Sequence, residues 1–463
     1  MTPVQPYRPD PRILELGNSF YDPVRAANFP ACTARFLNER AAAEVGLADV
    51  DWARHFCRFE PLEGNLERPL ALRYHGHQFR SYNPELGDGR GFLFAQLRDN
   101  AGRLMDLGTK GSGQTPWSRF GDGRLTLKGG VREVLATEML QALGVATSRS
   151  FALFETGEEL ERNDEPSPTR SAVLTRLSHG HIRIGTFQRL AFNDDVEGLE
   201  RLARYCLEHL YGEPADAGPE RLFALVVERT AALAASFMVA GFVHGVLNTD
   251  NINITGESFD YGPWRFAPDW EPGFTAAYFD HSGLYAFGRQ PEAVQWNLAQ
   301  LAGCLALLTD GHEGLQTSLE GFAGHFHAAL AAGMVRRLGL APASGEEDRL
   351  IARAAVAALG RKTVGIDRFF FDWRGGERPA GEAYADPAFD ALADAIGARR
   401  GDRSHAYWRD EEPCSMLIDE VESIWAAIAD RDDWSPFNAK VTAIRRMGDA
   451  LTPRAPSASN EPV

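Results

Sequence analysis

The chain is short of cysteine, and its cysteines show no pairing pattern. Five of them are scattered over 463 residues, odd in number and without C-x-x-C spacing: Cys32, Cys57, Cys206, Cys304 and Cys414. This distribution is typical of a reduced cytoplasmic protein rather than of a secreted disulfide scaffold. The first residues, MTPVQPYRPDPR, contain no apolar segment, so the sequence predicts no signal peptide and a cytoplasmic location.

Basic charge is also scarce. The chain carries 48 Lys and Arg against 64 Asp and Glu, which gives a net charge of −16. Nucleic acids and anionic membranes bind basic surfaces, so we expect neither among the partners. The longest uncharged run, residues 231–247, contains Ser236, Gly241 and His244. We therefore expect a buried helix that leads into a strand here, rather than a membrane span.

Apolar residues, in contrast, are plentiful. Hydrophobic residues make up 44% of the chain and aromatic residues 10%, enough for a globular core. Apolar runs between glycines predict strands at residues 91–97, 104–110 and 171–176. Helical periodicity predicts helices at 131–143, 296–308 and 350–359, and the chain beyond residue 195 is mainly helical.

One loop-like segment has the spacing of a known catalytic loop. Residues 244–251 read HGVLNTDN, and residues 260–262 read DYG. This is the frame of the protein-kinase catalytic loop, H-R-D-x-x-x-x-N, followed by a D-x-G tripeptide. Val246 stands where a kinase keeps its catalytic aspartate, and valine cannot accept a proton. The segment therefore predicts a nucleotide and metal site whose base has moved.

Three residues of this segment are candidates for the chemistry. Asn251 and Asp260 occupy the metal-binding positions of the pattern. Asp250, four residues beyond Val246, is the candidate base, because a carboxylate there can deprotonate an acceptor hydroxyl beside the metal. The alternative role for Asp250 is structural, in an Asx-type turn that stabilises the loop.

Further candidates precede this loop in the order found in kinases. In the segment GDGRG, Gly87 and Gly89 let the backbone approach phosphates and Arg90 can pair with them, although a tight hairpin turn explains the glycines equally well. Lys110 ends a predicted strand, and Glu133 in the following helix is its natural partner. Either residue alone is more often a surface charge, but their order together favours a nucleotide site.

Two more groups remain open between function and structure. Asp122 and Gly123 lie in a second glycine-containing loop, where they either contact ribose or phosphate or simply form a turn. Arg176 and Arg183 flank a short basic segment in an otherwise acidic chain. Such arginines bind phosphate through two hydrogen bonds, and surface salt bridges would explain them too.

These patterns together predict an α+β protein with a bilobal, kinase-like fold. The front half is rich in strands and the back half in helices. We expect five parts along the chain: an N-terminal extension at 1–65 with a helix at 31–45, a sheet-rich lobe at 66–175, a helical lobe at 176–345, a C-terminal helical region at 346–450 and a disordered tail at 451–463.

The sequence between about residues 70 and 305 strongly resembles the selenoprotein O family, also called YdiU, of kinase-fold protein adenylyltransferases. The segments that carry the resemblance are LGDGRG, DLGTKGSGQTPWSRFGDGRLTLKGGVREVLATEML, LTRLSHGHIRIGTF, HGVLNTDNINITGESFDYGP and FDHSGLYAFGRQPEAVQWNLAQLA.

The resemblance implies that ATP binds in a flipped orientation and that AMP passes to a Ser, Thr or Tyr hydroxyl with release of pyrophosphate. It implies Asp250 as the proton acceptor, Asn251 and Asp260 as magnesium ligands, and Glu133 as the partner of the lysine. The implied nucleotide contacts are Gly87, Gly89, Arg90, Lys110, Asp122, Gly123, Arg176 and Arg183, together with Asp260 through its metal.

Several functional readings stay open at this point. The expected partners are ATP and proteins with acceptor hydroxyls, and the expected cofactor is Mg²⁺ or Mn²⁺. Transfer of UMP with Mn²⁺ is a variant of the same activity. The alternatives are an atypical kinase that transfers the γ-phosphate, and a catalytically silent nucleotide-binding module.

Overall fold

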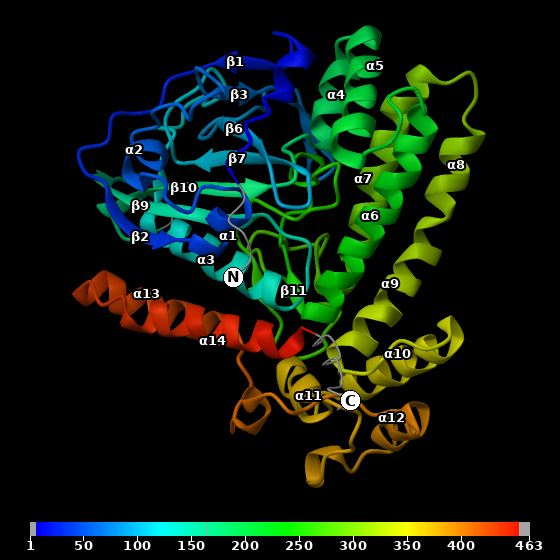
Figure 1. The fold of residues 1–463 in the computed structure, drawn as a ribbon. Coiled ribbons are helices and arrows are strands. Elements are labelled where there is room, and N and C mark those ends of the chain that lie inside the picture. The colour runs from blue at the N-terminus through cyan, green and yellow to red at the C-terminus, as the bar shows by residue number, and fades with distance from the viewer. Residues whose placement is uncertain (1–5, 164, 453–463) are drawn as a thin grey trace, which may run out of the picture.

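The computed structural model describes residues 6–163 and 165–452 and arranges them as a curled antiparallel sheet and a helical part (Figure 1). The sheet has eight strands in the order β1-β3-β6-β7-β10-β9-β2, with β8 paired to β10. In chain order its strands are β1 (Tyr21–Pro23), β2 (Thr33–Leu37), β3 (Leu70–Leu72), β6 (Leu93–Arg98), β7 (Leu104–Lys110), β8 (Leu125–Thr126), β9 (Arg149–Leu160) and β10 (Thr169–Ser178). A separate hairpin joins β4 (Gly76–Gln78) to β5 (Ser81–Asn83).

The central strands are buried on both faces because each face has its own cover. Successive side chains of a strand point to opposite faces. In β10, Leu174 packs into the core that contains helix α3 (Leu127–Ala142), whereas Val173 packs into the core that contains α1 (Glu39–Glu44) and α2 (Trp52–Phe56). Figure 1 shows α3 below the sheet and α2 against its other side. The chain's first part thus helps to enclose the sheet.

The predicted elements of the front half are confirmed, with one exception. The predicted strands correspond to β6, β7 and β10, and the helix predicted at 131–143 corresponds to most of α3. The helix predicted at 31–45 is wrong in its first half, because β2 pairs there with β9 and only α1 is helical. Asn38 separates the two elements by accepting a hydrogen bond from the Ala41 N–H at the start of α1.

The expectation that all cysteines are reduced is also wrong. Cys32 and Cys57 form a disulfide, with Cα atoms 6.0 Å apart. The two residues lie 25 positions apart in the chain without any motif between them, so their spacing gave no signal. Among the described residues Cys206, Cys304 and Cys414 are free thiols.

The helical part follows β10. Its helices are α4 (Ile184–Phe192), α5 (Val196–Tyr205), α6 (Pro219–Ala240), α7 (Gln290–Leu305), α8 (Glu313–Glu320), α9 (Phe322–Arg337), α10 (Gly345–Leu359), α11 (Ile366–Asp372), α12 (Pro387–Ile396), α13 (Ile418–Arg431) and α14 (Ser435–Leu451). The helices predicted at 296–308 and 350–359 are confirmed as α7 with a short 3₁₀ continuation and as α10.

Helix α6 is central to this part and leads into the predicted catalytic loop. By length and composition it could cross a membrane, but 67% of its apolar window is buried inside the protein, as in a core helix. Gly241 ends the helix with φ 70°, and β11 (Phe242–Val243) pairs with β12 (Arg265–Phe266) directly after it. The loop between these two strands carries HGVLNTDN and DYG, and the prediction of a buried helix followed by a strand is confirmed.

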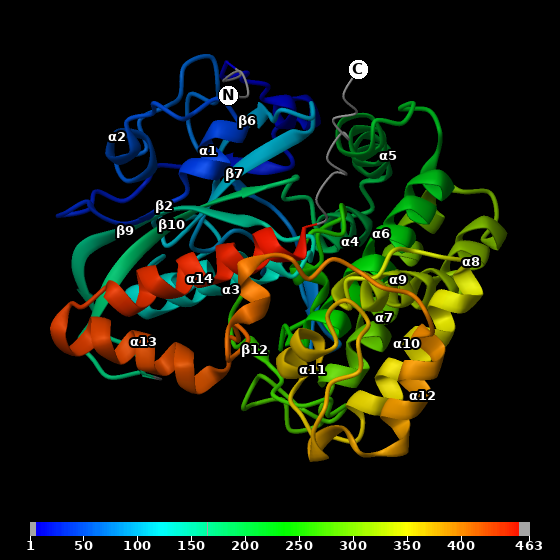
Figure 2. The same ribbon diagram turned by 60° about the horizontal axis from the view of Figure 1, so that its bottom comes forward.

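The last two helices return to the sheet. Helices α13 and α14 lie beside α3 in both ribbon views (Figure 2). Arg445 of α14 forms a two-pronged ion pair with Glu138 of α3, with the shorter contact at 2.7 Å. The predicted tail at 451–463 lies almost entirely outside the described residues.

Candidate active site

A cavity of about 680 Å³ brings most of the predicted site residues together. Those that line it are Gly87, Gly89, Arg90, Lys110, Asp122, Gly123, Arg176, Arg183, Asp250 and Asp260. The two other predicted residues contact residues that line the cavity: Glu133 contacts Lys110, and Asn251 contacts Asp260. Residues spread over 170 positions therefore converge on one site.

Lys110 lies at the centre of a buried ion cluster. It ends β7, and its Nζ is 2.5 Å from Glu133 Oε1 of α3 and 2.7 Å from Asp260 Oδ1. Lys110 and Glu133 are both buried. Because Thr126 caps α3 by accepting a hydrogen bond from Gly129 N–H, the helix begins early enough to place Glu133 in its second turn, facing the strand. The predicted lysine–glutamate pair is thus present as a contact.

Asp260 lies among cations. Its second oxygen, Oδ2, accepts a hydrogen bond from Asn251 Nδ2 at 3.2 Å, and Arg176 Nη1 is 3.5 Å from Oδ1. Burial on its own would raise the pKa of Asp260, but Lys110, Arg176, Arg90 and then Arg183 hold it well below the usual range. The carboxylate is therefore ionised, which a metal ligand requires.

Asp250 lies in the opposite kind of environment. It is buried in a 3₁₀ turn, Thr249–Asn251, and its Oδ1 has no hydrogen-bond partner. Burial raises the pKa of Asp250 to about 6, although the charge of Arg183 opposes this shift. Asp250 lines the cavity, and a carboxylate with a raised pKa in this position can accept a proton from a ligand.

Close packing by Gly76 fixes the position of Asp250. A Cβ atom at Gly76 would lie 3.1 Å from both the Cβ and Oδ1 of Asp250, and 3.1 Å from Thr249 Oγ1. The β4 strand can therefore approach the catalytic loop this closely only with glycine at this position.

Arg183 is held from three sides. Its Nη1 donates to the Asp250 backbone carbonyl at 3.1 Å, and its Nη2 donates to Asp88 Oδ1 at 3.0 Å. The guanidinium also stacks between Tyr74 and Phe259, with its carbon 4.2 and 4.8 Å from the two ring centres. This arginine connects the glycine-rich loop to the catalytic loop.

Sequence reasoning missed the role of Asp88. It stands between Gly87 and Gly89, lines the cavity, and accepts a hydrogen bond from Leu72 N–H through Oδ2. Burial raises its pKa, and the nearby Arg183 lowers it in part. Its place inside the GDG segment could have predicted such a role, because an acidic residue in a predicted phosphate-binding loop needs a cation beside it.

The two glycines beside Asp88 are required by packing. A Cβ at Gly87 would lie 2.4 Å from the Trp117 ring, and a Cβ at Gly89 would lie 2.8 Å from the Trp117 backbone oxygen. The loop that contains Trp117 packs closely against this segment, so neither position has room for a side chain. The same smallness leaves the backbone open to the cavity.

The outer end of the cavity is less enclosed. Asp122 is exposed there and forms an ion pair with Arg162 at 2.9 Å. Gly123 has φ 70° and packs against Gly113, so its turn requires glycine. The turn interpretation of these two residues is therefore satisfied, while both still line the cavity.

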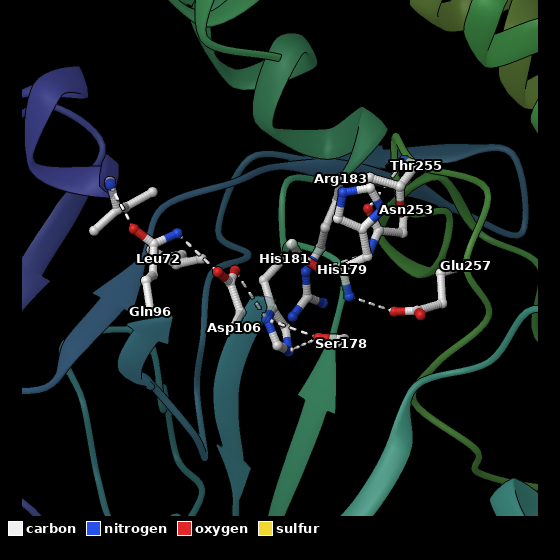
Figure 3. A network of polar contacts seen from close by, with 12 residues as sticks. Leu72, Gln96, Asp106, Ser178, His179, His181, Arg183, Asn253, Thr255 and Glu257 are labelled. Carbon is white, nitrogen blue, oxygen red and sulfur yellow. Dashed lines mark hydrogen bonds and ion pairs between the residues drawn. The ribbon is translucent and has the colours of Figure 1, made fainter. Parts of the chain in front are cut away.

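A buried polar layer supports the segment between Arg176 and Arg183 (Figure 3). Gln96 Nε2 donates to Asp106 Oδ1 at 2.7 Å, and Asp106 Oδ2 lies 3.3 Å from His181 Nδ1. The backbone N–H of His179 donates to Glu257 at 2.7 Å. These contacts explain why the basic segment is internal rather than a surface salt-bridge array.

The residues at Asn251 and Asp260 fit a divalent cation. Hard cations prefer carboxylate and amide oxygens, and Mg²⁺ typically takes one or two protein ligands besides phosphate and water. Asp260 is ionised and borders the cavity, and rotation of the Asn251 amide turns its oxygen toward the same carboxylate. Within the described residues no group of three or more His, Cys, Asp or Glu side chains forms a separate metal site.

The comparison with protein families decides the membership of the chain. A family model described as protein adenylyltransferase SelO matches residues 5–393. The chain belongs to the SelO family. It is similar to proteins named protein nucleotidyltransferase YdiU from Synechococcus elongatus and Synechocystis, at 42% and 41% identity. These alignments cover 95% and 94% of the chain, and 95% and 97% of the relatives.

A more distant SelO relative gives the same result. The protein nucleotidyltransferase YdiU of Rhodopseudomonas palustris is 36% identical over 91% of the chain and 90% of its own length. Membership of the SelO family makes the chain a nucleotidyltransferase, and hence an enzyme that uses a nucleotide substrate.

Proposed function

We propose that this enzyme transfers AMP from ATP to Ser, Thr or Tyr hydroxyls of proteins and releases pyrophosphate, on a bilobal kinase-like scaffold. The matching family is described as protein adenylyltransferase, which supports the choice of AMP. Within this scaffold we assign the sheet-rich lobe to residues 66–175 and the helical lobe to 176–345, with extensions at 1–65 and 346–450.

The observation that carries the proposal is where the two candidate base positions lie. Val246 is absent from the residues that line the cavity, whereas Asp250 lines it. A γ-phosphate kinase needs its base at the first position. A base at the second position fits an acceptor hydroxyl that attacks a different phosphorus of the same nucleotide.

The charge of the cavity also fits a polyphosphate. Seven Arg or Lys and five Asp or Glu side chains line it, although the whole chain has a net charge of −16. Among these cations Arg90, Lys110, Arg176 and Arg183 are close enough to Asp260 to lower its pKa. Such fixed cations stabilise the charge that develops on departing pyrophosphate.

In the proposed reaction the acceptor oxygen forms a bond to the α-phosphorus, and the bond from this phosphorus to the bridging oxygen of pyrophosphate breaks. The hydroxyl proton passes to the Asp250 carboxylate. Arg183 keeps the base in place through the Asp250 carbonyl, and Lys110 is kept in place by Glu133. A divalent cation bound by Asn251 and Asp260 would neutralise phosphate charge.

The test compares the position of the label in ATP. Purified protein is incubated with protein acceptors, Mg²⁺ or Mn²⁺, and ATP labelled at the α- or the γ-phosphate. We expect covalent labelling from α-labelled ATP together with stoichiometric pyrophosphate. Transfer of γ-label would identify an atypical kinase instead.

Two further outcomes separate the remaining alternatives. Stronger labelling by α-labelled UTP with Mn²⁺ than by ATP would replace AMP with UMP as the transferred group. Binding of ATP without transfer of any label would identify a silent nucleotide-binding module and overturn the proposal.

A further inference from the structure

The β4–β5 hairpin has a strained tip. Its strands pair Gln78 with Ser81, so Phe79 and Arg80 form the two-residue turn between them. Both have positive φ, 49° and 64°. Turns of this kind prefer Asn and Gly, because a side chain with a bulky Cβ substituent is disfavoured at positive φ. Two large residues here keep a conformational cost that a functional contact would explain.

The hairpin is attached to the catalytic loop. The Phe79 N–H donates to Asn248 Oδ1 at 3.0 Å, and the His77 N–H donates to Thr249 Oγ1 at 2.7 Å. Asn248 and Thr249 directly precede Asp250. The strained tip therefore stands next to the candidate base.

Aromatic side chains gather at the same place. The Phe79 ring centre lies 5.8 Å from that of Phe279 and 5.0 Å from that of Tyr285, and Phe279 lies 5.1 Å from Tyr278. Tyr285 is buried and donates its O–H to Asn248 Oδ1 at 2.6 Å. The others remain open to solvent, with Phe79 38%, Phe279 42% and Tyr278 82% exposed. We call these three residues the acceptor platform.

The platform is both rigid and apolar. Asp280 accepts hydrogen bonds from the Leu284 and Tyr285 N–H groups, both at 2.8 Å, which fixes the segment after Phe279. Arg80, the neighbour of Phe79 in the chain, is paired with Glu292, which also contacts Arg289. What the platform offers to a partner is therefore the ring surface of three neighbouring aromatic side chains.

We propose that the acceptor platform binds the polypeptide segment that carries the acceptor hydroxyl, through an aromatic or aliphatic side chain flanking that hydroxyl. This inference rests on the proposed function. Gln78, the residue before Phe79, lines the same cavity as Asp250, so a polypeptide that leaves the cavity along this hairpin meets the platform. The platform thus selects the sequence around the acceptor, while Asp250 acts on the hydroxyl itself.

The test uses positional peptide libraries with a fixed central Thr or Tyr, α-labelled ATP and the full-length protein. We expect the unmodified enzyme to prefer an apolar residue at one or two flanking positions. Tyr278→Ser and Phe279→Ala should lose this preference and raise the peptide KM about tenfold, because each removes apolar contact area. The ATP dissociation constant and the kcat at saturating peptide should stay unchanged.

Two variants separate recognition from folding. Phe79→Asn removes the ring, tolerates positive φ and keeps the N–H that binds Asn248, so it should lose the preference without loss of thermal stability. Leu350→Ala removes a side chain that is 49% exposed on α10, remote from the platform in sequence and outside the cavity, and should change neither parameter.

The outcomes distinguish the two proposals. If the unmodified enzyme transfers α-label but the platform variants keep its flanking preference and KM, the platform inference is wrong and the proposed function stands. If the unmodified enzyme transfers no α-label to any library or protein, both are wrong. A dimer of the unmodified protein that Phe279→Ala dissociates would show that a second copy covers the platform, and would overturn the inference.

Discussion

Asp250 in the catalytic loop and Asp260 in the D-x-G segment border the same cavity, but their pKa values are shifted in opposite directions. Asp260 lies beside Lys110, Arg176 and Arg90, which hold its pKa well below the usual range against the effect of burial. For Asp250, burial outweighs the charges of Arg183 and the weaker Arg119, and raises its pKa to about 6. The comparison shows that the surrounding cations, rather than the residue type, separate a metal ligand from a proton acceptor.

The largest effect should come from removing the free carboxylate. Asp250→Ala is expected to reduce nucleotide transfer by about 10²–10⁴-fold, the usual contribution of a general base. Binding of ATP should persist, because Arg183 contacts the Asp250 backbone carbonyl and not its side chain. Single-turnover rates and calorimetric ATP binding measure the two quantities. Loss of ATP binding together with activity would instead give Asp250 a role in holding the metal and nucleotide.

The next largest effect concerns Asp260 and its ion pair with Lys110. Lys110→Met should lower the free energy of unfolding by about 3–5 kcal/mol, because it leaves the buried Glu133 and Asp260 without their shared cation. Urea unfolding measures the change. Lys128→Met, on the helix α3 that carries Glu133, is the control, since the partner of Lys128, Glu422, is exposed and such pairs contribute about 0–1 kcal/mol. Equal losses in the two variants would contradict the buried cluster.

Much of this contrast could be predicted from the sequence. The order of Gly87, Lys110, Glu133 and Asp260 follows a known arrangement, and a family pattern of this kind specifies which residues meet even though they are far apart in the chain. The strands and helices around them have clear periodicity, so their positions were also predictable. Val246 pointed to a displaced base for the same reason.

Contacts without a local pattern could not be predicted. The pairing of β2 with β9, the Cys32–Cys57 disulfide and the attachment of the β4–β5 hairpin to Asn248 all join distant segments through shape and backbone bonds. No residue type or spacing in the sequence indicates these three contacts. The pairing of Asp88 with Arg183 belongs partly to this group, since the acidic residue was visible in the GDG segment but its partner was not.

A third carboxylate, Glu257, tests whether desolvation can outweigh nearby cations and raise a pKa. Burial raises the pKa of Glu257 to about 7, with a hydrogen bond from His179 N–H opposing the shift. In the folded protein Glu257 therefore retains its proton to higher pH than in the unfolded chain, so its stabilising contribution is complete below about pH 4.5 and falls as pH rises to about 7.

The measurement for Glu257 compares two pH values. Glu257→Gln keeps an oxygen acceptor for His179 but cannot ionise. Relative to the unmodified protein, the variant should be more stable at pH 8 than at pH 4.5, with a relative free energy of unfolding that is about 2–3 kcal/mol higher at pH 8. Glu422→Gln, an exposed residue on α13, should show little dependence on pH. A difference that does not change with pH would mean that the charges of Arg149 and Arg103 offset the effect of burial on Glu257.

The smallest expected effect tests the position of the free carboxylate rather than its charge. Gly76→Ala places a Cβ about 3.1 Å from Asp250 and Thr249, so the base must shift by a few tenths of an ångström. We expect transfer to fall about tenfold with ATP affinity retained, because reacting groups tolerate little misplacement. Gly303→Ala on α7, where a Cβ meets nothing within 4 Å, is the control and should leave the rate unchanged. An unchanged rate in Gly76→Ala would mean that Asp250 does not need the close support of β4, and that cations alone separate it from Asp260.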